Sequence, residues 1–330
     1  AGACRVAGAA TRPGQRGLPR PGAPAHATDW VAPAYRNWRL SERHLLNLAS
    51  AGQPVFHLRL LPPDDAQTWR AGDIAEIGPR NDPDQVAILL ARLGRAGDRE
   101  AAALLSRHHL PEPNALEGRS VSDWAALLKL LPHREYSIAS LPTDGTLDLV
   151  VRQTWKLDGS LGLGSGWLTC HAAPGQEIAL RIRENRSFHP PADPAPLILI
   201  GNGTGIAGLR AHLKHAEARG SGGHWLVFGE RNRAHDRLFS AELEHWRETG
   251  TLDRIDLAFS RDGEKKSYVQ HVLAAHADEL RRRVADGATI LVCGSLQGMA
   301  GEVTATLADL LGQDALDTLI DAQRYRRDVY

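Results

Sequence analysis

The spacing of apolar residues changes character partway along the chain. Residues 54–60 alternate apolar and polar positions, which is the period of a half-buried strand. Residues 197–200 and 290–293 are apolar at every position, as in strands of a parallel sheet that helices cover on both faces. The pattern therefore predicts two structural halves, an antiparallel one followed by a parallel one.

The first half is predicted to be a β-barrel whose ordered residues begin near Trp30. A turn at 62–65 separates the first two of five expected strands, which cover residues 54–60, 73–77, 136–139, 147–153 and 177–182. Residues 84–131 have helical spacing instead, and a short helix is expected to begin near Ser165. We therefore expect an antiparallel β-barrel domain over residues 30–192, with a small helical insertion at about 84–131.

The second half follows a proline-rich hinge at residues 190–196. Beyond it, apolar strands alternate with helical patterns: strands at 197–200, 225–228, 255–259 and 289–293, and helices to about 219 and over 236–248, 268–284 and 299–312. This alternation predicts a doubly wound parallel sheet. The α/β domain is expected over residues 193–330.

Residues 1–29 stand apart, because Ala, Gly and Pro dominate them and no acid precedes Asp29. Such a segment buries too little apolar surface to offset its chain entropy, so we expect it to be disordered. It lacks the continuous apolar centre of a secretory signal, and we interpret it as a linker or a remnant of a longer polypeptide.

Composition narrows the class of protein. Lys plus Arg and Asp plus Glu both number 39, so no global charge favours nucleic acid. The apolar runs are far shorter than the roughly 20 residues of a membrane helix. Three cysteines without a CxxC motif favour a reducing compartment. We expect a cytoplasmic protein, or one held at the cytoplasmic face of a membrane by a partner or a missing N-terminal region.

A glycine-rich loop, residues 201–207, connects the strand at 197–200 to a helix. Its sequence Gly-Asn-Gly-Thr-Gly-Ile-Ala lets the backbone approach a diphosphate, and the helix N-terminus supplies N–H donors. The spacing is GxGxG and not GxGxxG, and it also suits an ordinary tight turn between a strand and a helix.

A second group of polar residues follows the strand at 255–259. It offers a hydroxyl, a guanidinium, an ammonium, a phenol and an amide, from Ser260, Arg261, Lys266, Tyr268 and Gln270. Together these groups suit a phosphate monoester such as the 2′-phosphate that distinguishes NADPH from NADH. A solvated charged loop is the alternative, because Asp262 and Glu264 are interspersed.

The first half carries a second candidate phosphate site. Arg134-Glu135-Tyr136-Ser137 opens a predicted strand, and the turn Gly162-Leu163-Gly164-Ser165 opens a short helix. Two phosphate sites imply two dinucleotides, one in each domain. Arg134 would neutralise the second diphosphate and Tyr136 would lie against a heteroaromatic ring, although Tyr136 also suits a core position in a strand. The pair His108-His109 has no further ligands at suitable spacing, so we predict no metal site.

Seven segments, taken in order, resemble the ferredoxin-NADP reductase superfamily, and within it the reductase half of the diflavin reductases. They are residues 134–137, 162–168, 201–207, 228–239, 260–270, 292–300 and 324–330. The last segment, which ends in Tyr330, is similar to that of the sulfite reductase flavoproteins. The resemblance covers about residues 35–330 and implies an FAD-binding β-barrel followed by an NADP-binding domain.

The resemblance also implies roles for single residues. Those for FAD are Arg134 on its diphosphate, Tyr136 and Ser137 beside its ring system, Gly162, Gly164 and Ser165 at its phosphates, and Tyr330 over the flavin. Those for NADPH are Gly203 and Thr204 at its diphosphate with Arg231 nearby, and Ser260, Arg261, Lys266, Tyr268 and Gln270 at its 2′-phosphate. Ser137, Cys293, Asp328 and Tyr330 correspond to the catalytic residues around hydride transfer.

The chain also departs from the family pattern. Asn202 and Gly208 stand where the family usually has proline, which is expected to loosen the NADPH loop, and Ser295 replaces a common Asp. We expect no flavodoxin-like FMN domain before residue 30 in this sequence. Electrons are therefore expected to pass to a separate domain or protein (an FMN-bearing flavodoxin-like domain, a haemoprotein or a membrane redox partner), or the chain is a fragment of a longer one. The alternatives are a ferric or haem-partner reductase of the same superfamily and a non-catalytic nucleotide-binding module.

Overall fold

The first half of the protein is a closed antiparallel sheet. The structure is a computed structural model that describes residues 34–64 and 68–330. Its first six strands are β1 Arg36–Leu45, β2 Val55–Leu61, β3 Ile74–Gly78, β4 Arg134–Ser137, β5 Leu147–Arg152 and β6 Glu177–Arg183. They pair in the order β4-β3-β6-β1-β2-β5, and a bridge between Ile138 and Leu149 joins the two ends of the sheet. The predicted antiparallel barrel is confirmed.

Strand β1 was not predicted, and the reason lies in its composition. Only Trp38 and Leu40 of its ten residues are buried, and charged residues surround them. The strand nevertheless lies between β2 and β6 in the middle of the sheet. Its position is therefore set by pairing with strands that come later in the chain. The turn at 62–65 and the predicted start near Trp30 lie partly or wholly outside the described residues, as does the segment 1–29.

The helical insertion forms where the spacing predicted it. It contains α1 Pro83–Arg92, α2 Arg99–Leu105 and α3 Val121–Leu127. The side chains of Asp82, Asp98 and Ser120 cap the first turns of the three helices. Leucines and Trp124 pack into a core that is separate from that of the sheet. Later in the chain, α4 Leu163–Gly166 runs into a π-helical turn, Trp167–His171.

The second half is a parallel sheet of five strands: β7 Leu197–Asn202, β8 His224–Glu230, β9 Leu252–Phe259, β10 Thr289–Gly294 and β11 Tyr325–Val329. The strand order is β11-β10-β7-β8-β9. The chain moves outward from β7 through β9 and then returns to the other side of β7. The carboxyl ends of β7 and β10 therefore form the topological switch point, where open α/β sheets bind ligands.

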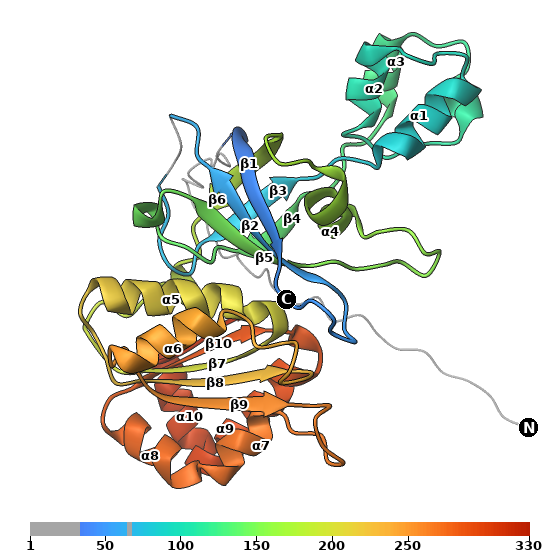
Figure 1. Cartoon of the computed structure of the whole chain (residues 1–330). Helices are drawn as coiled ribbons and strands as arrows, with labels where there is room; N and C mark the ends of the chain where they lie inside the picture. Colours follow the sequence, from blue (N-terminus) through green and yellow to red (C-terminus); the bar gives the residue numbers. More distant parts are fainter. Residues whose placement is uncertain (1–33, 65–67) are drawn as a thin grey trace, which may run out of the picture. The chain divides into compact units, whose positions relative to one another are not determined.

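Alternating residues of the strands pack on opposite faces of this sheet. Leu197 and Leu199 contact the helices α5 Ile206–Ala218 and α6 Ser240–Glu248, whereas Ile198 and Ile200 belong to the core on the other face. That face is covered by α7 Val269–Ala275, α8 Ala277–Ala285, α9 Gly301–Leu311 and α10 Gln313–Asp321 (Figure 1). Helices on both faces confirm the doubly wound prediction.

Two helix boundaries differ from the prediction. The helix expected from 236 begins at Ser240, because the buried carboxylate of Asp236 accepts hydrogen bonds from Asn232 N and Asn47 Nδ2 and Phe239 takes a positive φ of 54°. The helix expected over 268–284 breaks at His276, where φ is −119°. Neither break occurs at Gly or Pro, the residues that usually mark the end of a helix in a sequence. The sequence pattern therefore reveals neither of them.

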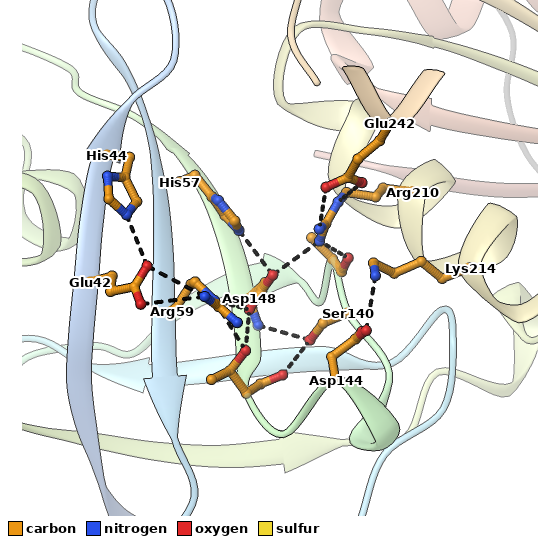
Figure 2. Close-up of polar contacts among 12 residues, drawn as sticks. Glu42, His44, His57, Arg59, Ser140, Asp144, Asp148, Arg210, Lys214 and Glu242 are labelled. Atoms are coloured by element: carbon orange, nitrogen blue, oxygen red, sulfur yellow. Dashed lines mark hydrogen bonds and ion pairs between the residues drawn. The ribbon is translucent and has the colours of Figure 1, made fainter. Parts of the chain in front are cut away.

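A buried ionic cluster joins the two sheets (Figure 2). Arg210 of α5 donates from Nη1 to Asp148 Oδ2 at 3.0 Å and to the carbonyl oxygen of Ala139 at 2.7 Å. Asp148 also accepts a 2.9 Å hydrogen bond from His57. Burial works to raise the pKa of Asp148, but the hydrogen bond from His57 and the neighbouring charges outweigh it and hold that pKa below its ordinary value. Among the described residues, no helix is both long enough and apolar enough to span a membrane.

Candidate functional site

A cavity of about 990 Å³ lies at the switch point and reaches the antiparallel sheet. Its walls include Tyr136 and Ser137 of β4 and, across from them, Gly203 and Thr204 after β7. A smaller cavity of about 300 Å³ shares Tyr136, Ser137 and Tyr330 with it. The larger volume is in the range of small-molecule sites, about 300–1,000 Å³. Two adjoining cavities therefore meet at the end of β4.

The glycine loop after β7 depends on its missing side chains. Gly203 has a positive φ of 55°, and a Cβ on Gly205 would lie 2.1 Å from the carbonyl oxygen of Cys293. No residue other than glycine fits that close approach between β7 and β10. The loop then enters α5, so backbone N–H groups of its first turn are available to an anion.

The predicted catalytic trio is brought together from three strands. The hydroxyl of Ser137 donates to Asp328 Oδ2 at 2.5 Å, and Cys293 Sγ lies 3.7 Å from the same oxygen. Parallel pairing of β10 with β11 sets Cys293 beside Asp328. All three side chains are buried. Burial and the nearby Asp328 charge raise the pKa of the Cys293 thiol, and burial also raises the pKa of Asp328.

Tyr330 is held by hydrogen bonds of both its backbone and its phenol. Its backbone N donates to Gly294 O at 3.1 Å, and its carbonyl oxygen accepts from Leu296 N at 2.9 Å. Its phenol donates to Thr204 Oγ1 at 3.2 Å, and the residue as a whole remains about half exposed, at 55%. The terminal ring thus lies across the mouth of the glycine loop and borders both cavities.

The predicted site in the first half is compact. A Cβ on Gly164 would lie 2.6 Å from Arg134 Cγ and 2.7 Å from the Tyr136 hydroxyl, so the turn before α4 packs directly on the β4 motif. Gly162 has similarly little room. Two polar side chains of this site have partners within the protein. Ser165 Oγ is engaged with Thr154 at 2.8 Å, and Arg134 Nη1 donates to the carbonyl oxygens of residues 132 and 133.

The predicted 2′-phosphate group is only partly assembled. Ser260, Tyr268 and Gln270 line the larger cavity, as does Arg231, which was predicted near the diphosphate. The side chains of Arg261 and Lys266 are exposed and do not line it. Their loop is anchored nearby, since the backbone N of Arg261 donates to Arg231 O at 2.9 Å. Neither cation has an ion pair with another described residue.

Three residues at the cavity were not predicted as site residues. Asn202 Oδ1 accepts from Ser295 N at 3.1 Å and ties the ends of β7 and β10 together. The expectation that Asn202 loosens this loop stays a prediction. Arg152 and Glu230 form a 2.7 Å ion pair between the two sheets. Each of the two lies at the carboxyl end of its strand, and this position was the only indication in the sequence that they belong to the site. The sequence does not indicate that they pair with each other, because they are 78 positions apart.

One group of side chains has metal-ligand chemistry in the described part of the chain. Ligand atoms of Glu76, His133 and Glu135 lie within 4.8 Å of one another. Arg181 and Arg183 form ion pairs with these carboxylates, which leaves little negative charge for a cation. His108 Nδ1 bonds to the carbonyl oxygen of Leu104 at the end of α2. The absence of a metal site stays a prediction.

An antiparallel barrel, a doubly wound sheet and a Ser–Asp–Cys cluster at their junction form the arrangement expected from the resemblance to the ferredoxin-NADP reductase superfamily. Residues 199–305 match the family model described as "Oxidoreductase NAD-binding domain". The chain is similar to the flavoprotein alpha-component of NADPH sulfite reductase from Bacillus subtilis, with 28% identity over 86% of this chain. It is also similar to the same component from Vibrio cholerae (29% over 88%) and from Serratia proteamaculans (37% over 62%).

These matches confirm the resemblance to the ferredoxin-NADP reductase superfamily that the motifs predicted. The chain spans 59% and 58% of the lengths of the Bacillus and Vibrio relatives, and its match to the Serratia relative covers 37% of that protein. The comparison therefore concerns part of each relative.

Proposed function

We propose that this chain is an NADPH-dependent flavoprotein reductase, which takes a hydride from NADPH onto FAD and passes the electrons to a separate redox partner. The observation that carries the proposal is the buried cluster of Ser137, Asp328 and Cys293 at the point where two cavities meet. Relatives whose names include NADPH and flavoprotein support it.

The residues of the first half suit FAD. The turn at Gly162 and Gly164 leaves no space for side chains and lies against Arg134 and Tyr136, which is the geometry of a backbone cradle for phosphates. Arg134 would change partners from backbone carbonyls to the diphosphate. In this proposal residues 30–192 form the FAD domain, with Tyr136 and Ser137 at the flavin ring and Ser165 holding the cradle in shape through Thr154.

The residues of the second half suit NADPH. Gly203 and Thr204, in the turn that leads into α5, would hold the diphosphate, with Arg231 on the same cavity wall. Ser260, Tyr268 and Gln270 line the cavity for the 2′-phosphate, and the loop that carries Arg261 and Lys266 would close over it. Residues 193–330 are the NADP domain in this proposal.

FAD, when bound, supplies the chemistry that accepts a hydride. The chain supplies position and charge. Asp328 Oδ2 accepts from Ser137, which fixes the carboxylate at the end of β4, and it stabilises positive charge that develops beside it. The buried thiol of Cys293 lies 3.7 Å from the same carboxylate oxygen, and Tyr330, bonded to Thr204, would cover the reacting position until the nucleotide enters. A non-catalytic module would have no need for this cluster.

The acceptor is proposed to be a flavodoxin-like FMN domain or a haemoprotein on a separate chain or a further part of the same protein. The relatives are components of sulfite reductase, and this chain matches only part of each. A ferric or haem-partner reductase of the same superfamily uses the same two-domain site. Turnover with ferricyanide, a flavodoxin and a sulfite reductase haemoprotein, measured side by side, separates these acceptors.

Flavin content tests the FAD assignment. Heat release followed by chromatography is expected to give one FAD and no FMN per chain. Gly164→Ala places a methyl group 2.6–2.7 Å from Arg134 and Tyr136 and is expected to abolish FAD retention. Gly301→Ala is the matched control, because its Cβ enters open space. Recovery of FMN, or a flavin-free protein after reconstitution, contradicts the proposal.

A further inference from the structure

Asp262 follows Arg261 in the predicted 2′-phosphate loop, and it has no role in the proposed function. A carboxylate beside a phosphate site opposes the phosphate through charge repulsion. Both carboxylate oxygens of Asp262 are nevertheless engaged: Oδ1 accepts from Asn232 Nδ2 at 3.1 Å, and Oδ2 accepts from Arg233 N at 2.9 Å. The acid therefore binds two donors of the loop that follows β8.

The same loop after β8 fixes the backbone of Arg261. The N of Arg261 donates to Arg231 O at 2.9 Å, and its carbonyl oxygen accepts from Asn232 Nδ2 at 3.3 Å. Just before it, Ser260 N donates to Glu230 O at 2.9 Å. These bonds continue the pairing of β8 with β9 beyond the ends of the strands. The backbone of Arg261 is thus held in place, and its exposed side chain is left to meet a ligand.

The loop after β8 is in turn held by the barrel. Asp236 is only 2% exposed, and it accepts from Asn232 N at 3.0 Å and from Asn47 Nδ2 at 3.2 Å. Asn47 lies just after β1, and its Oδ1 accepts from Val55 N at 2.7 Å at the start of β2. A chain of hydrogen bonds therefore runs from the barrel through Asp236 and Asn232 to Asp262.

We infer that Asp262 is a positioning residue for the 2′-phosphate of NADPH, because it helps Asn232 to hold the backbone of Arg261; this rests on the proposed function. Its charge opposes the phosphate, but an exposed charge is screened by water and salt. A displaced contact to the ligand costs more than this weak repulsion. Selection of NADPH over NADH thus depends on an acid that does not itself contact the nucleotide.

Glu264 is the matched control. It is an exposed acid of the same loop, and no hydrogen bond or ion pair joins it to another described residue. Asp262→Ala and Glu264→Ala remove the same charge, so an effect of charge alone makes both variants bind the phosphate more tightly. Only a loss of position makes Asp262→Ala bind it more weakly. The two explanations therefore predict changes of opposite sign.

The test is equilibrium binding to the FAD-loaded full chain, measured by calorimetry with three probes. NADP⁺ and 2′-AMP contain the 2′-phosphate, and NAD⁺ does not. Asp262→Ala is expected to weaken NADP⁺ and 2′-AMP by a similar factor of roughly 3–30, and to change NAD⁺ by less than about twofold. Glu264→Ala is expected to leave NADP⁺ unchanged or to tighten it by up to about threefold. Asp262→Asn keeps Oδ1 as an acceptor and is expected to recover part of the loss.

Asn232→Ala removes the other side of the same hydrogen bond. It leaves the backbone N of Asn232 free to donate to Asp236, so the loop keeps its anchor on the barrel. The variant is expected to show the same selective loss of NADP⁺ and 2′-AMP. The double variant Asp262→Ala/Asn232→Ala is expected to lose no more than the weaker-binding single variant, because the two residues act as a unit. Additive losses overturn the inference.

Each other outcome has a distinct meaning. Equal weakening of all three probes in Asp262→Ala shows that the acid only supports the fold, and tighter NADP⁺ binding in that variant shows that its charge alone matters; either result overturns the inference. If the wild-type chain prefers NADP⁺ to NAD⁺ and Asp262→Ala keeps that preference in full, the inference fails while the proposed function stands. If the wild-type chain binds no NADP⁺, both fail.

Discussion

The hydroxyl of Ser137 donates a 2.5 Å hydrogen bond to Asp328, a residue 191 positions later in the chain. The bond joins the end of β4 in the barrel to β11 in the parallel sheet, and it exists only when both sheets are folded and docked. A Ser–Asp contact of this kind lies at the proposed point of hydride transfer, and it makes the titration of Asp328 sensitive to a residue in the other half.

Ser137→Ala is expected to change the pH dependence of flavin reduction. Burial raises the pKa of Asp328, and the Ser137 hydrogen bond opposes that rise, so its loss moves the pKa further up. The folded pKa is already above the unfolded value. The stability that Asp328 contributes is therefore present at low pH and is lost as pH rises through the folded pKa. We predict that the acidic limb of the pH–rate profile moves to higher pH in Ser137→Ala and disappears in Asp328→Asn. An unmoved limb in both variants would assign it to another group.

Arg261→Ala tests the loop that the structure leaves outside the cavity. If the loop closes on the 2′-phosphate, the variant loses one charged hydrogen bond of about 1.5–3 kcal/mol, and the KM for NADPH rises roughly 10–100-fold. The KM for NADH is expected to stay within about twofold. Lys266→Ala should show the same pattern. Equal losses with both nucleotides would mean that Arg261 has a structural role.

Tyr330 is expected to act as a gate. Tyr330→Ala removes the ring that NADPH must displace, so NADH kcat/KM should rise by at least about tenfold, and product release should slow. Tyr330→Phe keeps the ring and loses the bond to Thr204, and it separates the contribution of that bond from that of stacking. Flat NADH activity together with lost FAD would show that Tyr330 retains the flavin and is not a gate.

Arg210→Gln is expected to destabilise the chain by about 3–5 kcal/mol in urea unfolding, because it leaves Asp148 and Glu242 without their buried partner. Arg237→Gln removes an exposed pair with Glu244 and should cost no more than about 1 kcal/mol. The pKa of Asp148 is depressed in the fold, so its contribution is present above the unfolded pKa and lost as pH falls through the folded one. The loss in free energy of unfolding caused by Arg210→Gln should therefore become smaller in acid. A deficit that does not change with pH would contradict this account of the cluster.

The elements that the sequence predicts well are those whose own residues decide their structure. The first four residues of strand β7 are all apolar and buried, whichever face of the sheet they lie on. The glycines Gly201 and Gly205 cannot be replaced by larger residues, because a Cβ there would collide with the carbonyl oxygen of Cys293. Strand β1 escaped prediction because pairing with β2 and β6 decides it. The same distinction between local and long-range causes applies to the site residues. Ser137 and Cys293 lie in recognisable motifs at strand ends, whereas the Arg152–Glu230 pair depends on how two sheets dock.

The central claim is that NADPH reduces FAD held in this chain. The most direct measurement is an anaerobic titration of the FAD-loaded protein with NADPH, followed through the flavin absorbance, with NADH in parallel. The account predicts complete bleaching at one NADPH per FAD, with NADH requiring a much higher concentration. Asp328→Asn should slow the bleaching without changing FAD content. A flavin that stays oxidised in the presence of bound NADPH would contradict the account.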